Sequence, residues 1–247
     1  MKLFILSAGK GTRLWPLTKN TPKPLLTFDD GTTILERQIE NALKDHLFSE
    51  IIIITGYKSE QIEAKIKDYK TRIPITIFYN PVYDLTNNLV SVWVAHHLMQ
   101  NEDFMITNGD NIYRNGVFAK IQTDKSETIL VTVDYKDKYD DDDMKVMLSD
   151  DGKISRISKQ IPIKQTDAES VGLVLVKGEK CRRLFVNKVI ELVKEKEYLD
   201  KFWLEIFNSL IDSGIFINKA EIAQDDWQEV DFHPDVDVMK KFILKDF

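Results

Sequence analysis

The sequence has only one cysteine, Cys181, among its 247 residues. A single cysteine excludes a disulfide within the chain and a metal site built from several cysteines. The histidines show no His-x-x-x-His or His-Cys grouping of the kind that binds metals: His46, His96, His97 and His233. We therefore expect no catalytic histidine, and we interpret Cys181 as a bystander near the start of a helix.

The sequence also lacks a long hydrophobic run and an excess of basic residues. No stretch approaches the roughly 18 apolar residues that a membrane-spanning helix needs. The apolar run at the N-terminus, Leu3–Leu6, is too short for a signal peptide. The formal net charge is −6, whereas a general nucleic-acid binder is normally basic. We therefore expect a cytoplasmic protein that binds neither membranes nor nucleic acid.

The remaining composition is that of an ordinary globular protein, with 43% hydrophobic and 30% charged residues. A chain of this length can bury a sizeable core. No internal repeat, low-complexity linker or shift in composition marks a domain boundary. We predict a single domain over residues 1–247, with an antiparallel elaboration roughly from 128 to 176.

Apolar residues in the first half alternate between strand and helix patterns. The predicted strands are 3–6, 51–55, 73–79 and 103–107, and the predicted helices are 34–47, 59–69 and 88–99. Repeated β-α-β units imply an α/β protein with a three-layer, Rossmann-like α/β/α fold and a mainly parallel, mixed sheet. Ligands of such folds bind at the carboxyl ends of the strands, which is where Gly9 and Asp110 would lie.

The second half of the sequence changes character. Strand patterns cover 128–135 and 171–176, and a hairpin is predicted from 144–148 and 154–157 around Asp151-Gly152. Helical patterns cover 179–196, 202–213 and a closing segment, 236–244.

The first predicted strand leads directly into a loop of small residues, whose backbone can approach a ligand closely: Ser7, Ala8, Gly9 and Gly11. Three cations follow in the sequence, Lys10, Arg13 and Lys23. A glycine-rich turn offers convergent backbone N–H donors, and fixed cations neutralise phosphate charge. The pattern indicates a nucleoside-triphosphate site. It is neither a Walker loop, in which the lysine follows the second glycine, nor a Rossmann loop, which has glycine where this chain has Leu14.

The full string Gly-x-Gly-Thr-Arg-Leu-x-Pro-Leu-Thr-x-x-x-Pro-Lys-Pro-Leu-Leu, residues 9–26, resembles the signature loop of the nucleotidyltransferases that make NDP-sugars and CDP-alcohols. The resemblance implies the nucleotidyltransferase fold. It also implies that Arg13 and Lys23 contact the nucleotide's phosphates, with Lys23 near the α-phosphate. The backbone that would hold the nucleotide is that of Ser7, Ala8, Gly9, Gly11 and Thr12.

Nucleotidyl transfer needs no side-chain base, because the second pKa of a phosphate monoester is near 6 and the nucleophile is already largely ionised. The sequence should instead supply cations and a metal site. Mg²⁺ prefers one or two carboxylates with phosphate oxygens and water. Asp110, in Asn-Gly-Asp-Asn, and Asp231, in Gln-Glu-Val-Asp, resemble the family's metal-binding aspartates. Other acidic residues lie close to Asp231, so spacing alone does not settle the second ligand: Asp225, Asp226, Glu229, Asp235 and Asp237.

Four consecutive carboxylates, Asp140 to Asp143, form a second acidic feature. Adjacent carboxylates converge on one ion only with an unusual backbone, so we interpret the run as an exposed turn.

The segment with Asn87, Asn88 and Ser91 is similar to the Asn-Asn-x-x-Ser stretch of bacterial CTP:phosphocholine cytidylyltransferases. An asparagine amide can both donate to and accept from a cytosine edge or a ribose. The same asparagines also suit a helix N-cap, and both interpretations stay open. The resemblance covers nearly the whole chain and implies CTP as the nucleotide.

The acceptor is expected to contact four residues in the second half. Lys159 stands where the family has the lysine of Glu-Lys-Pro, although its neighbours differ. The stretch that contains Asp200 and Trp203 resembles the segment around the choline head group in the cytidylyltransferases. Glu169 and Asp200 are alternatively suited to an ammonium group. The resemblance implies phospho-L-glutamine or phosphocholine as the acceptor, a role in surface polysaccharide or capsule phosphoramidate decoration, and a homodimer.

Two alternatives remain open at this stage. One is a sugar-1-phosphate nucleotidyltransferase that uses UTP or dTTP. The other is a nucleotide-binding protein on the same fold that has lost catalysis.

Overall fold

The apolar runs of the first half form a parallel group of strands at one side of a nine-stranded sheet in the computed structural model, which describes residues 1–242. Four of its strands are β1 (Lys2–Ser7), β2 (Glu50–Thr55), β3 (Ile75–Tyr79) and β4 (Phe104–Asn108). Strand β1 pairs in parallel with β2 and β4, and β2 pairs in parallel with β3. The side chains of β1 alternate between two cores, which is why the whole strand is apolar.

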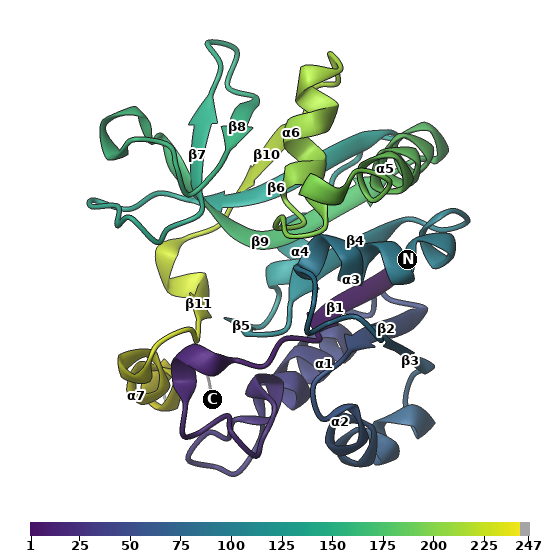
Figure 1. The fold of residues 1–247 in the computed structure, drawn as a ribbon, viewed down its shortest axis with the longest axis vertical. Coiled ribbons are helices and arrows are strands. Elements are labelled where there is room, and N and C mark those ends of the chain that lie inside the picture. The colour runs from purple at the N-terminus through teal and green to yellow at the C-terminus, as the bar shows by residue number, and fades with distance from the viewer. Residues whose placement is uncertain (243–247) are drawn as a thin grey trace.

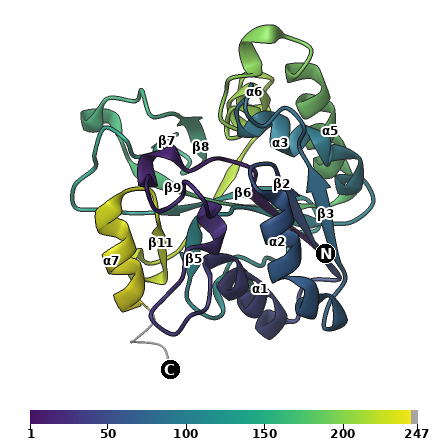
Figure 2. The same cartoon turned by 60° about the horizontal axis from the view of Figure 1, so that its bottom comes forward.

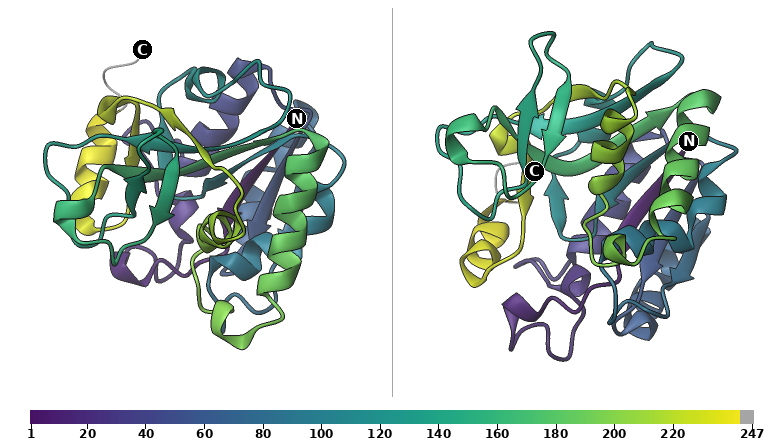
Figure 3. Two further views of the ribbon diagram at one scale, coloured as in Figure 1. Left: turned by 90° about the horizontal axis from the view of Figure 1, so that it is seen from above. Right: turned by 45° about the horizontal axis from the view of Figure 1, so that its top comes forward.

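The second half extends the same sheet. Strand β9 (Ala168–Lys177) pairs antiparallel with both β4 and β6 (Thr128–Asp134), and β10 (Asn218–Glu221) pairs in parallel with β6. The predicted hairpin forms from β7 (Lys145–Leu148) and β8 (Ile154–Ile157), and β7 pairs with the first residues of β9. The predicted mainly parallel, mixed sheet is confirmed. Of the segment 128–176, only the hairpin and its loops project from the body of the molecule (Figure 3).

Helices cover both faces of the sheet, which confirms the three-layer prediction (Figure 1). One face is covered by α1 (Ile34–Asp45), α2 (Ser59–Lys65) and α4 (Val117–Lys120). The other face is covered by α3 (Asn88–Val94), α5 (Glu179–Leu192) and α6 (Glu205–Asp212). Several helices are shorter than predicted. After α2 and α3 the chain tightens into 3₁₀ turns over Lys67–Thr71 and His96–Met99.

A small second sheet, which the sequence did not predict, pairs the segment directly after β4 with a segment near the end of the described chain. It consists of β5 (Asn111–Tyr113) paired antiparallel with β11 (Trp227–Glu229). The final helix, α7 (His233–Phe242), follows β11 and lies beside the loop after β1 (Figure 2). The predicted helix 236–244 thus begins three residues earlier, and its last two residues lie outside the described part of the chain. Within residues 1–242, no helix has the length and apolar character needed to cross a bilayer.

Candidate active site

The site lies where the carboxyl ends of β1 and β4 meet. Gly109 donates its backbone N–H to the Leu6 carbonyl at 2.8 Å, and a Cβ on Gly109 would lie only 2.6 Å from that oxygen. Only glycine permits this approach, which places the next residue, Asp110, beside the loop that follows β1. The sequence prediction that Gly9 and Asp110 share one edge of the sheet is confirmed, since both line the same cavity.

The glycine-rich loop is shaped by two 3₁₀ turns. Gly11 has a left-handed backbone, with φ 62°, and its carbonyl accepts a hydrogen bond from the Thr18 hydroxyl at 2.6 Å. The second turn, Lys23–Leu25, begins after Pro22 and has Pro24 at its second position. The proline-flanked turn fixes the backbone of Lys23, whose side chain is buried in the site.

Lys23 lies between two carboxylates. Its Nζ is 2.7 Å from Asp110 Oδ2 and 2.9 Å from Asp231 Oδ1. Arg13 forms an ion pair with the other oxygen of Asp231, and its guanidinium lies over the Phe232 ring at 5.5 Å from the ring centroid. Residues separated by about 200 positions in the sequence therefore form one charged cluster.

Three carboxylates of this cluster could hold a metal ion. One oxygen from each of Asp110, Glu229 and Asp231 lies within 4.8 Å of the others. Asp110 Oδ1 is buried and has no hydrogen-bond partner among the described residues. Burial, together with the nearby charge of Asp110, raises the pKa of Glu229 to about 7. Three crowded carboxylate oxygens match the ligands that Mg²⁺ prefers, so the residues fit the expected cation. Glu229 is one of the five acidic residues near Asp231 among which spacing alone did not settle the second metal ligand.

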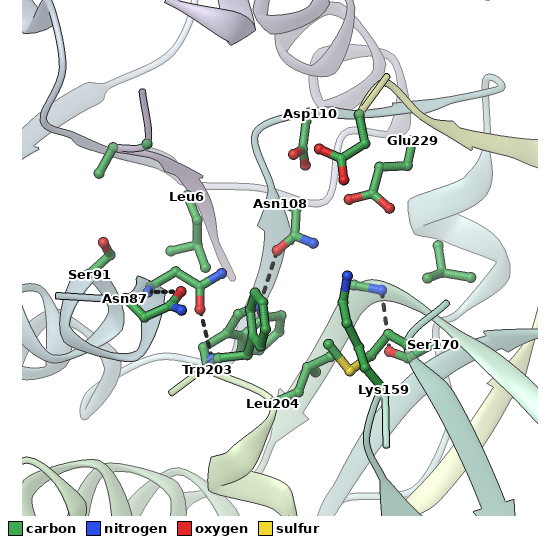
Figure 4. A pocket seen from close by; sticks show the side chains of 18 of the residues that line it. Leu6, Asn87, Ser91, Asn108, Asp110, Lys159, Ser170, Trp203, Leu204 and Glu229 are labelled. Carbon is green, nitrogen blue, oxygen red and sulfur yellow. Dashed lines mark hydrogen bonds between the residues drawn. The ribbon is translucent and has the colours of Figure 1, made fainter. Parts of the chain in front are cut away.

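Two adjoining cavities open onto this cluster. One has a volume of about 260 Å³ and the other about 390 Å³. The first is lined by several of the predicted residues: Ala8, Gly9, Arg13, Asn87, Asn88, Ser91, Asp110, Lys159, Glu169, Trp203 and Asp231. The second adds the remaining loop residues: Ser7, Gly11, Thr12 and Lys23. Figure 4 shows Asp110 and Glu229 side by side at one end of the first cavity, with Asn87 and Ser91 at the other end.

The asparagine pair has structural roles as well as access to the cavity. Asn87 is the N-cap of α3, and its Oδ1 accepts from the Asn88 backbone N–H at 2.8 Å. Asn88 Oδ1 accepts from the Trp203 backbone N–H at 2.8 Å. The Ser91 hydroxyl accepts from Asn80 Nδ2 at 3.1 Å. The cap interpretation is therefore confirmed for Asn87, and the contact with a nucleotide stays a prediction.

The predicted acceptor residues fall into two groups. Trp203 is buried, lines the first cavity, and donates from Nε1 to Asn108 Oδ1 at 3.0 Å. Lys159 lines the same cavity and lies over the Phe202 ring at 5.5 Å from its centroid. Asp200 is exposed and lines neither cavity within residues 1–242; its backbone carbonyl accepts from Asn87 Nδ2 at 3.5 Å. Its contact with an acceptor stays a prediction.

The acidic run forms an exposed turn, as predicted, but one of its members reaches the site. Asp142 lines the first cavity and accepts a hydrogen bond from Lys159 Nζ at 2.9 Å. Its other oxygen lies 3.4 Å from Arg13 Nη1. The sequence offered no signal that would distinguish Asp142 from Asp140 or Asp141, because the contacts depend on how the turn folds back over the sheet.

Glu169 is buried in β9 and forms an ion pair with Lys136. Burial raises its pKa from an ordinary 4.5 to about 8, although Lys136 acts in the opposite direction. A carboxyl whose pKa is higher in the folded state stabilises the fold fully below about pH 4.5, and this contribution declines as the pH rises toward 8.

We therefore expect the unfolding free energy of the wild type, relative to that of Glu169→Gln, to fall between pH 5 and pH 9. The fall should exceed about 1.4 kcal/mol, the equivalent of one pKa unit. Urea denaturation of both proteins at pH 5, 7 and 9 measures it. A difference that stays constant across this range would show that Glu169 does not titrate differently in the folded and unfolded states.

Comparisons with known proteins agree with this geometry. A family model described as "Nucleotidyl transferase" matches residues 2–223. The CTP:phosphoglutamine cytidylyltransferase of Campylobacter jejuni is 26% identical over 264 aligned positions, which cover 96% of this chain and 98% of that protein. The choline-phosphate cytidylyltransferase of Streptococcus pneumoniae is 36% identical over 115 residues, 47% of each chain.

Solved structures give the same fold. That of a CTP:phosphocholine cytidylyltransferase from Streptococcus pneumoniae superposes with a TM-score of 0.77 at 24% identity, over 99% of both chains. Relatives with sugar-phosphate substrates in their names, such as a UTP–glucose-1-phosphate uridylyltransferase of Haloferax volcanii, also match. With several curated relatives, the match covers less than half of the relative's own length.

Proposed function

Because the chain belongs to the nucleotidyl transferase family, we propose that it is a Mg²⁺-dependent cytidylyltransferase. It joins CTP to a small phosphorylated acceptor, phospho-L-glutamine or phosphocholine, and releases pyrophosphate. The CDP-linked product would serve the decoration of a surface polysaccharide.

The position of Lys23 is the observation that supports this function most strongly. Its ammonium group lies within 3 Å of Asp110 and Asp231, beside the glycine-rich loop, and Arg13 lies on the other side of Asp231. Two polyanionic substrates can meet only where positive charge offsets their repulsion. A buried lysine and an arginine supply positive charge at one point, and a cation held by the three carboxylates would add to it.

The chemistry requires positioning and charge neutralisation. An oxygen of the acceptor's phosphate attacks the α-phosphorus of CTP, a new P–O bond forms, and the bond from the α-phosphorus to the bridging oxygen breaks as pyrophosphate leaves. Lys23 and Arg13 would hold the nucleotide's phosphates, and Lys159 would hold the phosphate of the acceptor. Mg²⁺, held by Asp110 and Asp231 with Glu229 beside them, would neutralise part of the developing charge.

The choice of CTP and of an amine-bearing acceptor rests on separate observations. Asn87 and Asn88 line the cavity with amide groups that can both donate and accept. Two of the cytidylyltransferase relatives are named for phosphoglutamine and choline phosphate, and both of these acceptors carry a positively charged nitrogen. Aromatic side chains suited to such a group line the same cavity, namely Phe202 and Trp203. Glu169 lines it as well, but burial raises its pKa to about 8, so the aromatic rings carry this argument.

Pyrophosphate release with Mg²⁺ tests the proposal. CTP, UTP, dTTP, ATP and GTP are each combined with L-glutamine phosphate, phosphocholine and glucose-1-phosphate. We expect release with CTP and one of the two amine-bearing acceptors. Release with UTP or dTTP and glucose-1-phosphate would replace the proposal with a sugar nucleotidyltransferase. CTP binding without release in any combination would favour a catalytically inactive binding protein.

A further inference from the structure

The carboxylate of Asp142 contacts a cation on the proposed acceptor side of the site and a cation on the proposed nucleotide side. It belongs to the exposed acidic turn between β6 and β7, yet its carboxylate reaches into the first cavity. Oδ1 accepts from Lys159 Nζ at 2.9 Å, and Oδ2 lies 3.4 Å from Arg13 Nη1. One carboxylate thus contacts both Lys159, the cation proposed for the acceptor's phosphate, and Arg13, a cation proposed for the nucleotide's phosphates.

The neighbouring aspartates are arranged differently. Asp143 forms an ion pair with Lys136 and caps the turn by accepting from the Asp140 backbone N–H. Asp141 is exposed, and its side chain forms no ion pair within residues 1–242; its backbone carbonyl accepts from Lys145 Nζ. Asp142 is therefore the member of the run whose carboxylate lines the first cavity and contacts Lys159 and Arg13.

Asp142 is an anion at neutral pH. Burial alone would raise its pKa, but the hydrogen bond from Lys159 and the charges of Lys159 and Arg13 hold the pKa below its ordinary value. The two cations that would bind substrate phosphates thus already share an anionic partner. A carboxylate and a phosphate compete for the same donors on lysine and arginine, and two anions at one place repel each other.

We propose that Asp142 is a place-holding anion: its two carboxylate oxygens occupy positions on Lys159 and Arg13 that the acceptor's phosphate and the nucleotide's phosphates take when they bind. The inference rests on the proposed function, because it assigns substrate phosphates to these two cations. A bound phosphate displaces the carboxylate, and the exposed turn gives Asp142 solvent into which to move.

This exchange couples the two substrates. A nucleotide that takes Arg13 removes one of the two cations that hold Asp142, so the carboxylate then competes less strongly for Lys159. Each substrate accordingly binds more tightly in the presence of the other, and by linkage the enhancement is the same in both directions.

The test measures anion binding without turnover. Inorganic phosphate and CTP are titrated separately into the wild type, Asp142→Asn and Asp141→Asn by calorimetry at fixed salt. Asp141→Asn is the matched control, because it removes the same charge one residue away. We expect Asp142→Asn to bind inorganic phosphate about tenfold more tightly than Asp141→Asn does. The gain should disappear when Lys159→Met is added to Asp142→Asn.

Phosphate binding by Asp142→Asn that is equal to or weaker than that of Asp141→Asn would overturn the proposal. It would mean that Asp142 positions Lys159 rather than competing for it. A gain that persists in the double variant would also overturn it, because Lys159 would then not be the cation released. Neither readout depends on which nucleotide or acceptor reacts, so failure here is distinct from failure of the pyrophosphate-release assay.

Discussion

Replacing Lys23 with methionine is expected to lower kcat by about 10²–10³-fold, the usual effect of losing one charge-assisted contact in the transition state. Methionine keeps most of the aliphatic length of lysine but removes the ammonium group that lies between Asp110 and Asp231. Steady-state pyrophosphate release measures the loss. Lys19→Met is the matched control, because Lys19 is exposed in the same loop and lines neither cavity within the described residues.

The same variant should bind a divalent cation at least as tightly as the wild type. Lys23 Nζ contacts oxygens of two of the three carboxylates that could hold the ion, so the ammonium and the cation compete for them. Titration with Mn²⁺ in the absence of nucleotide separates this effect from turnover. Full activity in Lys23→Met, or a loss of activity equal to that of Lys19→Met, would contradict the role of Lys23.

Replacing Asp110 with asparagine is expected to lower kcat at least about 10²-fold and to weaken Mn²⁺ binding at least about tenfold. Asp110 contributes one of the three clustered carboxylates, and its Oδ1 is buried with no partner among the described residues. An amide keeps the size of the side chain but loses the charge that a cation needs. The readouts are pyrophosphate release and Mn²⁺ titration of the purified protein.

Asp225→Asn is a suitable control for this prediction. Asp225 is exposed and lines a cavity together with Glu229 and Asp231, but it is not one of the three clustered carboxylates. Its substitution removes the same charge as Asp110→Asn. If Asp110→Asn and Asp225→Asn both bind Mn²⁺ as tightly as the wild type, the metal site does not include Asp110.

Local patterns in the sequence were sufficient to predict the body of the fold. The run Leu3–Leu6 is apolar because its side chains alternate between two cores, and Gly109, after β4, is needed for the close approach to the end of β1. Helix ends were less predictable, because the last turns of two predicted helices tighten into 3₁₀ geometry, which the apolar spacing does not reveal.

Two parts of the site could not be predicted, because both depend on contacts between distant segments. Strands β5 and β11 have three residues each, too few for a periodic signal, yet their pairing is what brings Glu229 next to Asp110. The sequence does not distinguish Asp142 from its acidic neighbours, because its contact with Lys159 arises only when the turn folds over that lysine. Asp200, by contrast, was predicted from a resemblance, but its side chain lies outside both cavities.

The most direct test of the proposed reaction is ³¹P NMR of the protein incubated with Mg²⁺, CTP and phosphocholine or L-glutamine phosphate. Attack of the acceptor's phosphate on the α-phosphorus predicts two coupled diphosphate resonances from a CDP-linked product, formed in equal amount with pyrophosphate. Appearance of CMP with pyrophosphate, or of CDP with inorganic phosphate, would instead show hydrolysis of the nucleotide and would contradict a transferase.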